Sequence, residues 1–206
     1  MTEIVLMRHG VTSWNQRGLL QGHSDVALSD EGRRQARLLA LRMAREDRPA
    51  ALYSSDLRRA RETADIVAEA CGLDVIPTRA LREHHYGVFE GVSWEAYRDE
   101  IVRASELRGI GPSEYRPEGG ESRRDFARRI EDFLAGILES HRGGVIWIVC
   151  HGGVIRYIVE WLVRPDEDPF PSSNRVANVG VTRLRREGGG WHIAELNSVE
   201  HLEPSS

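Results

Sequence analysis

The order of short apolar runs and amphipathic stretches is the feature that most constrains this chain. Apolar runs typical of buried strands occupy Glu3 to Met7, Ala50 to Tyr53, Leu73 to Ile76 and Val145 to Cys150, and we expect Pro77 to end the third of them. Amphipathic stretches with helical spacing separate these runs. Because alternating strands and helices pack as a parallel sheet covered by crossover helices, the order predicts a three-layer α/β/α fold. Its sheet should be mainly parallel and doubly wound, with an antiparallel edge strand.

Local signals bound the expected helices. The first covers Arg33 to Arg45 after the caps Ser29 and Asp30, and the second follows the capping cluster Ser54-Ser55-Asp56 and stops at Gly72. We expect further helices over Trp94 to Val102, Ser122 to His141 and Val154 to Val163, and an edge hairpin from Ala177 to Leu184 and Trp191 to Leu196.

The chain has 206 residues, which is the size of one ordinary domain with additions. We therefore expect a single domain over 1–206. Glycine and proline accumulate before residue 121, which favours loop over core, so the region of about 84–121 is interpreted as a lid or insert.

Composition excludes several classes of protein. Hydrophobic residues at 40% and charged residues at 29% exclude a disordered chain, and a net charge of −4 argues against a nucleic-acid or anionic-membrane partner. All 28 basic residues are arginine, so lysine chemistry is excluded, whereas the planar guanidinium suits bidentate binding of phosphate. With two cysteines and no signal peptide or spanning segment, we expect a cytoplasmic protein.

Two of the expected strands end in a histidine followed by glycine, His9-Gly10 and His151-Gly152. Ligands of open α/β sheets bind at the carboxyl ends of the strands. In addition, the second helix begins with several arginines, which oppose the helix dipole unless an anion binds there. The sequence therefore predicts a phosphate site at this end of the sheet.

These residues, taken together, resemble the histidine phosphatase superfamily, in its phosphoglycerate mutase-like branch with the Arg-His-Gly motif. The chain opens with Met7-Arg8-His9-Gly10 followed by Thr12, Trp14 and Asn15. The resemblance covers nearly all of the chain. Further matches, in the family's order, are Gln21-Gly22 with Asp25, Leu28 and Gly32; Ser55-Asp56-Leu57-Arg58-Arg59-Ala60 with Thr63-Ala64; Leu81-Arg82-Glu83 with Gly87 and Glu90-Gly91; Gly119-Gly120-Glu121-Ser122; His151-Gly152-Gly153; and Asn197 with His201-Leu202.

The resemblance implies a metal-independent phosphatase without a cofactor, acting on small phosphorylated metabolites. His9 is then the nucleophile that becomes phosphohistidine, and Glu83 is the proton donor. Arg8, Arg59 and His151 form the phosphate pocket, in which their charge offsets the phosphate and spreads it in the transition state. The substrate-binding residues implied are Asn15, Gln21, Gly22, Tyr86 and Gly152. A homodimer is common in the family.

Three alternatives stay open. A 2,3-bisphosphoglycerate-dependent phosphoglycerate mutase uses the same phosphohistidine, and Glu83 to Gly87 looks closer to the mutase version of this segment, although the short region after Gly91 favours a phosphatase. Cys150 and Arg156 satisfy the C-x5-R spacing of cysteine-dependent phosphatases. A non-catalytic phosphate-binding protein on the same fold is the third. The sequence leaves the substrate and the role of His84 and His85 open.

Overall fold

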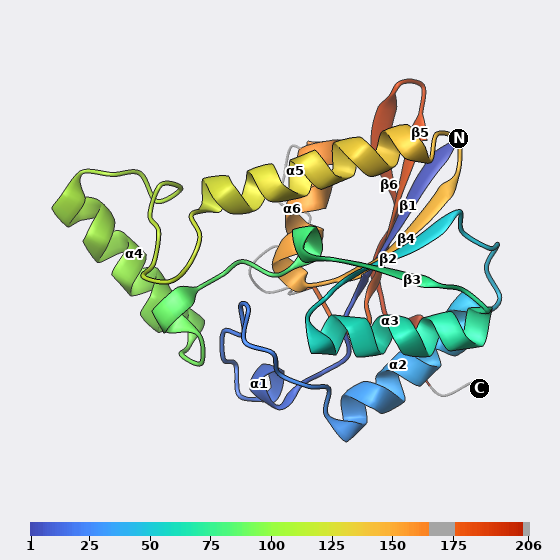
Figure 1. Cartoon of the computed structure of the whole chain (residues 1–206), viewed down its shortest axis with the longest axis horizontal. Helices are drawn as coiled ribbons and strands as arrows, with labels where there is room; N and C mark the ends of the chain where they lie inside the picture. Colours follow the sequence, from blue (N-terminus) through green and yellow to red (C-terminus); the bar gives the residue numbers. More distant parts are fainter. Residues whose placement is uncertain (165–175, 204–206) are drawn as a thin grey trace.

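The computed structural model describes residues 1–164 and 176–203, and a six-stranded sheet forms its centre (Figure 1). The first four strands run parallel, β5 pairs antiparallel with β1, and β6 pairs antiparallel with β5. The spatial order is β3-β2-β4-β1-β5-β6. This confirms the expected α/β fold with a hairpin at one edge. The strands are β1 (Thr2–Arg8), β2 (Ala51–Ser55), β3 (Val75–Thr78), β4 (Val145–Cys150), β5 (Val181–Glu187) and β6 (Gly190–Ser198).

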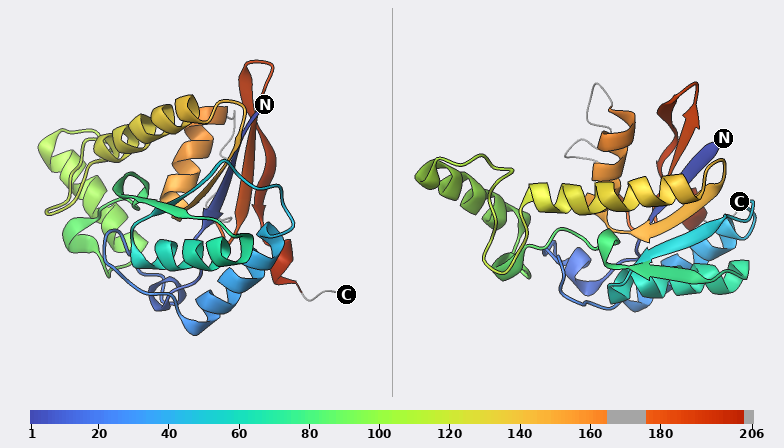
Figure 2. Two further views of the ribbon diagram at one scale, coloured as in Figure 1. Left: turned by 45° about the vertical axis from the view of Figure 1, so that its right-hand side comes forward. Right: turned by 45° about the horizontal axis from the view of Figure 1, so that its top comes forward.

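Helices cover both faces of the sheet, as Figures 1 and 2 show. The helices α2 (Asp30–Met43) and α3 (Arg58–Cys71) lie on one face, and α5 (Arg123–Ser140) and α6 (Gly152–Val163) lie on the other. Side chains of β1 alternate between the two cores, with Val5 and Met7 packed under α2 and α3, and Ile4 and Leu6 packed under α5 and α6. The three layers follow directly from this alternation.

The segment of about residues 84–121 extends away from the sheet, beyond the N-terminal end of α5 (Figure 2). Its helix α4 (Trp94–Arg108) begins at the N-cap Ser93 and ends at Gly109, which adopts the left-handed conformation at φ +62°. The sequence correctly predicted this helix but ended it six residues too early. Short helical elements complete the chain: α1 (Ser13–Gln16), η1 (Arg79–Leu81), η2 (Gly87–Phe89) and η3 (Glu200–Leu202). Within 1–164 and 176–203, no helix combines the length and apolar character needed to cross a membrane.

Two local expectations were wrong. The cluster Ser54-Ser55-Asp56 does not cap α3, because Ser54 and Ser55 are the last residues of β2 and the N-cap is Leu57, which makes no side-chain cap bond. Pro77 does not close the third strand but lies inside β3 opposite Ser54. An edge strand tolerates proline because one side of its backbone has no partner strand.

The loop after β1 is held against the start of α2 by close backbone contacts. Ser29 caps α2 and donates from both its backbone nitrogen and its hydroxyl to the carbonyl of Val11. Gly32 lies so close that a Cβ there would stand 2.1 Å from the Val11 oxygen, and a Cβ on Gly10 would stand 2.5 Å from the Gly32 oxygen. Only glycine fits this contact, which fixes the position of the loop that follows His9.

We expect Gly32→Ala to lower the free energy of unfolding by about 2–3 kcal/mol, because its methyl group must displace backbone rather than a flexible side chain. The matched control is Gly136→Ala in α5, where a Cβ meets nothing within 4 Å. That change should raise the free energy of unfolding by about 0.5–1 kcal/mol, since alanine loses less backbone entropy in a helix. Urea unfolding followed by circular dichroism measures the free energy of unfolding of both variants. Equal effects at the two positions would contradict the requirement for glycine at position 32.

Candidate active site

The parallel pairing of β1 with β4 brings the two histidines together. Arg8 lies opposite Cys150 in the register, so His9 and His151 leave the sheet at the same edge. Their ring centroids are 5.2 Å apart. The two strands therefore end next to each other, as we expected from the sequence.

His9 is buried and holds a single tautomer. Its Nδ1 donates to the carbonyl of Gly10 at 2.7 Å, which leaves the Nε2 lone pair unprotonated. Burial, followed by the charges of Arg59 and Arg8, holds the pKa of His9 well below its usual 6.5, and the Gly10 contact opposes this only in part. His9 is therefore a neutral imidazole with a free Nε2 at neutral pH.

Two arginines supply the positive charge. Arg59 in α3 is fully buried, and its two terminal nitrogens donate to the carbonyls of Ser24 and Gly22 at 2.8 Å each. Burial is the main cause that lowers its pKa to about 10, so it stays a cation at neutral pH. Arg8 is anchored by donation to the carbonyl of Val176.

Buried nitrogen atoms of Arg59 and His151 lack a hydrogen-bond partner among the described residues of the chain. They are Nε of Arg59 and Nδ1 of His151, whose Nε2 is already bonded to Ser55. An unsatisfied buried donor costs roughly 1–3 kcal/mol, and more when the group is charged. Such atoms in one cation-rich site are expected to bind an anion with several acceptor oxygens.

The Glu83 carboxylate is held by backbone amides. Oε1 accepts from the nitrogen of His84 and Oε2 accepts from the nitrogen of Gly153, each at 3.0 Å. A Cβ at Gly153 would stand 2.4 Å from Oε1, so the second glycine after His151 permits this approach. Because each oxygen has two lone-pair directions, one position on each is still available for a proton.

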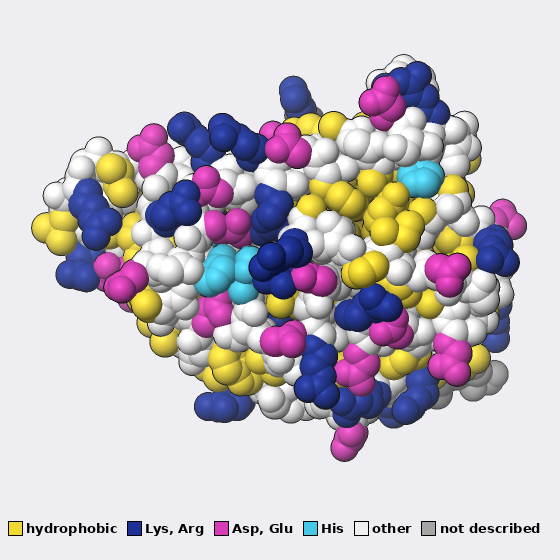
Figure 3. All heavy atoms as spheres, in the orientation of Figure 1, with side chains coloured by type: hydrophobic (Ala, Val, Ile, Leu, Met, Phe, Trp, Pro, Cys, Tyr) yellow, Lys and Arg dark blue, Asp and Glu magenta, His cyan; other side chains and the backbone are white. Residues whose placement is uncertain are grey.

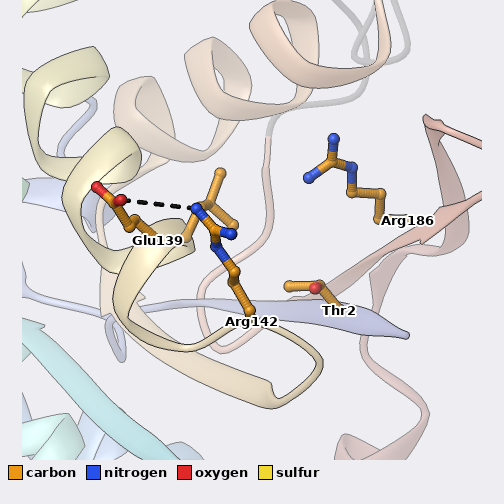
Figure 4. A pocket seen from close by; sticks show the side chains of 5 residues that line it. Thr2, Glu139, Arg142 and Arg186 are labelled. Atoms are coloured by element: carbon orange, nitrogen blue, oxygen red, sulfur yellow. Dashed lines mark ion pairs between the residues drawn. The ribbon is translucent and has the colours of Figure 1, made fainter.

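These groups surround a small cavity of about 120 Å³. A larger cavity of about 530 Å³ lies at the opposite end of β1, where Arg142 and Glu139 form an ion pair and Arg186 lies nearby (Figure 4). The smaller cavity is the candidate active site, because histidines with lowered pKa values and the buried arginine meet there. Its lining residues are Arg8, His9, Asn15, Leu19, Leu20, Gln21, Arg59, Glu83 and Tyr86.

Three residues that the sequence assigned to the site lie around this cavity rather than on its lining. His151 packs against His9. Gly22 lies behind Arg59 and accepts its hydrogen bond, and its φ of +48° with the carboxylate of Glu90 at the Cβ position excludes other residues. Gly152 starts α6 beside the guanidinium of Arg8.

Sequence reasoning missed several residues of the site. Leu19 and Leu20 form an apolar wall. Asn178 donates from Nδ2 to the carbonyl of His9 at 2.9 Å and reaches Oδ1 of Asn15 at 3.3 Å. Ser55 is bonded to His151. Ser55 belongs to a segment that matches the family, but the match assigned no role to it, and no signal in the sequence distinguishes Asn178 from other polar residues near strand ends.

Cys150 is unsuited to act as a nucleophile. It is fully buried in β4, and burial raises the pKa of its thiol far above the ordinary value. It does not line the cavity, and Arg156 lies on α6 within 3.8 Å of Glu160. The spacing of these two residues does not correspond to a phosphate-binding loop.

Glu90 connects the base of the 84–121 segment to Arg59. Its two carboxylate oxygens accept from the backbone nitrogen of His23 at 2.7 Å and the hydroxyl of Ser24 at 2.5 Å. The loop that it holds supplies the carbonyls of Gly22 and Ser24 to Arg59. Glu90 therefore positions Arg59 through this loop.

We expect Glu90→Ala to weaken the binding of inorganic phosphate about tenfold, because the loss of a charged acceptor releases the carbonyls that orient Arg59. Glu90→Gln, which keeps one acceptor oxygen, should have a smaller effect. Glu106→Ala, on the exposed side of α4, is the matched control. Calorimetric titration measures the three dissociation constants for phosphate. An unchanged value in Glu90→Ala would show that Glu90 does not position Arg59.

His84 is a second buried group beside the site. Its ring contacts Tyr86 and Phe126, and neither ring nitrogen has a partner among the described residues. Burial is the main cause that lowers its pKa to about 4. His85 instead lies against His23, with ring centroids 4.1 Å apart, so the side chains of the two adjacent histidines point to different surroundings.

Stability should fall as the pH drops from 6.5 toward 4, because the unfolded chain binds a proton at His84 near pH 6.5 and the folded chain does not. His9, His23, His151 and His201 have lowered pKa values too and act in the same direction. We expect His84→Phe to reduce the loss between pH 7 and pH 5 by on the order of 2 kcal/mol. His192→Gln, on the half-exposed edge strand β6, is the control. Urea unfolding at each pH tests this, and equal slopes in His84→Phe and the wild type would refute it.

Comparison with known proteins identifies the family of this chain. The model of the histidine phosphatase superfamily (branch 1) matches residues 4–199. The chain is 39% identical to phosphoglycerate mutase-like protein 4 of Arabidopsis thaliana, over 98% of this chain and 87% of that protein. It is 35% identical to a metal-independent phosphoserine phosphatase of the same plant, over 98% and 84%.

A solved structure of a phosphatase has a similar fold. The mycobacterial glucosyl-3-phosphoglycerate phosphatase is 30% identical and superposes with a TM-score of 0.77, covering 95% of this chain and 98% of that one. The chain thus belongs to branch 1 of the histidine phosphatase superfamily, and it is a phosphoric monoester hydrolase.

Proposed function

We propose that the phosphatase reaction of this chain proceeds through a phosphohistidine on His9, with Glu83 as the proton donor. One observation carries the proposal: Nε of Arg59 and Nδ1 of His151 are buried near the neutral His9, and neither atom has a hydrogen-bond partner among the described residues. A phosphoryl group would satisfy both donors. Arg8 and Arg59 would balance its charge in a site that excludes most water.

The first step forms a bond from Nε2 of His9 to phosphorus and breaks the bond from phosphorus to the ester oxygen. The alkoxide that leaves takes a proton from Glu83. A water molecule then attacks phosphorus and gives its proton to the Glu83 carboxylate, which releases inorganic phosphate and restores His9. Support for Glu83 comes from its place on the cavity lining and from the amides that hold it without occupying all its lone pairs.

Two amide side chains would add hydrogen bonds to the phosphate. The Oδ1 atom of Asn15 accepts from Thr12, and the Oε1 atom of Gln21 accepts from the Thr12 hydroxyl at 3.0 Å. Their NH2 groups are thereby directed away from Thr12, and both residues line the cavity. We assign them to the binding of phosphoryl oxygens.

The substrate is a small phosphorylated metabolite, and we propose that its leaving group is compact. The cavity has room for little beyond a phosphoryl group, and its remaining wall is made of Leu19, Leu20 and Tyr86. Of the relatives' substrates, phosphoserine has the size that this cavity favours, whereas glucosyl-3-phosphoglycerate is larger. Selection then depends on the residues around Tyr86.

Phosphoglycerate mutase activity is the second candidate. Tyr86 lines the cavity where the resemblance to mutases placed it, and one relative is called phosphoglycerate mutase-like. A mutase must keep water from its phosphoenzyme. The relatives named as phosphatases favour hydrolysis over this alternative.

We also propose that the protein forms a homodimer and is cytoplasmic. Hydrophobic side chains gather between α5 and β3 on the face that Figure 3 shows, and Ile76 of the edge strand β3 is exposed. A paired copy would cover this apolar surface and the unpaired strand edge. Light scattering tests the dimer.

The decisive measurement is phosphate release with EDTA present from phosphoserine, 3-phosphoglycerate, glucosyl-3-phosphoglycerate and α-ribazole phosphate. We expect turnover by the wild type and by Cys150→Ser, loss of at least about 1000-fold in His9→Ala, and a loss of about 100-fold in Glu83→Gln. The smaller loss reflects the removal of proton transfer alone.

Other outcomes would redirect the assignment. Activity that survives His9→Ala but not Cys150→Ser would overturn the assignment of His9 as the nucleophile. Interconversion of 3-phosphoglycerate and 2-phosphoglycerate without phosphate release would favour the mutase. Phosphate binding without any turnover would favour a non-catalytic phosphate-binding protein.

A further inference from the structure

We infer that Ser55 is a positioning residue that fixes which ring nitrogen of His151 carries the proton. Ser55 is the last residue of β2, and His151 directly follows the adjacent strand β4. The Ser55 hydroxyl lies 2.8 Å from Nε2 of His151, and both residues are fully buried. The strand pairing thus makes a hydrogen bond that water does not reach.

The protons at this contact have one consistent arrangement. The Ser55 oxygen accepts from the backbone nitrogen of Leu57 at 3.3 Å, and its own proton finds no acceptor other than His151 among the described residues. His151 is neutral, because burial and then Arg59 hold its pKa well below 6.5. If the hydroxyl donates to Nε2, the single ring proton must reside on Nδ1.

The opposite arrangement leaves one more group unsatisfied. A proton on Nε2 would make Ser55 accept twice, and the hydroxyl proton would have no acceptor. Nδ1 would then be a bare lone pair in a buried position without a partner. The positive charges that act on this ring are those of Arg59 and Arg8, so the lone pair would lie at the place where an anion is expected to bind.

The tautomer decides whether His151 attracts or repels the substrate. With the proton on Nδ1, His151 donates to a phosphoryl oxygen without carrying a charge. With the proton on Nε2, two lone pairs would face each other. This inference rests on the proposed function, because it needs a phosphoryl group at the site. It assigns the protonation of Nδ1 of His151 to Ser55, a residue that does not line the cavity.

The test is nitrogen-15 NMR of histidine-labelled protein, with the His151 signals assigned from their loss in His151→Gln. The chemical shifts separate a protonated ring nitrogen from an unprotonated one. We expect the wild type to show a protonated Nδ1 and an unprotonated Nε2, whether or not phosphate is bound. This measurement needs no Ser55 variant, so it is decisive even if such a variant does not fold.

Substitutions extend the test to function. We expect Ser55→Ala to release the tautomer and to weaken inorganic phosphate binding about tenfold, which corresponds to one hydrogen bond. Ser55→Thr, which keeps the hydroxyl, should restore both properties. Ser54→Ala is the matched control, because this equally buried hydroxyl donates to the Ser55 carbonyl at 2.8 Å and not to His151.

A protonated Nε2 in the wild type would overturn the inference, and so would an unchanged tautomer or phosphate affinity in folded Ser55→Ala. Failure of the proposed function looks different. In that case the wild type releases no phosphate from any substrate, while the tautomer and its dependence on Ser55 are still as described.

Discussion

The parallel pairing of β1 with β4 is the constraint on which the site depends. It places His9 and His151 at neighbouring strand ends, with their rings 5.2 Å apart. Two imidazoles this close and this deeply buried cannot both be charged, and the adjacent arginines make protonation of either one less favourable. The chemistry of the pocket therefore depends on neutral histidines whose tautomers are fixed by their surroundings, Gly10 for one and Ser55 for the other.

A charged guanidinium in the interior of the protein is costly unless its nitrogens are hydrogen-bonded. Arg59 is fully buried, and two backbone carbonyls of one loop satisfy its terminal nitrogens. The carboxylate of Glu90 holds this loop from the far side, and Gly22 has to be glycine to allow the approach. Arg59 is thus surrounded first by the loop carbonyls and then by Glu90 and Gly22. We expect a change at Glu90 or Gly22 to displace the guanidinium that we propose binds the substrate.

The sequence allowed the three layers, the mainly parallel sheet and its antiparallel edge hairpin to be predicted, because apolar periodicity records burial, and it placed His9 and His151 at strand ends. It could not identify Ser55 or Asn178, whose roles depend on pairing between distant segments. Ser54-Ser55-Asp56 was misread as a cap because serine at a strand end and serine at an N-cap look alike in one dimension. Pro77 was misread as a stop because only the sheet order shows that β3 is an edge.

Neutral histidines have a consequence for charge balance. Arg8 and Arg59 together carry about two positive charges, which matches a phosphomonoester in its dianionic form. If either histidine were protonated, the empty pocket would hold three positive charges in a buried space and would be harder to maintain, and a protonated His9 could not attack. Neutral imidazoles avoid this and still contribute one nucleophilic lone pair and one hydrogen-bond donor. The lowered pKa values of the two histidines and the buried arginine are therefore parts of a single electrostatic arrangement, in which only the arginines carry the positive charge that we propose binds phosphate.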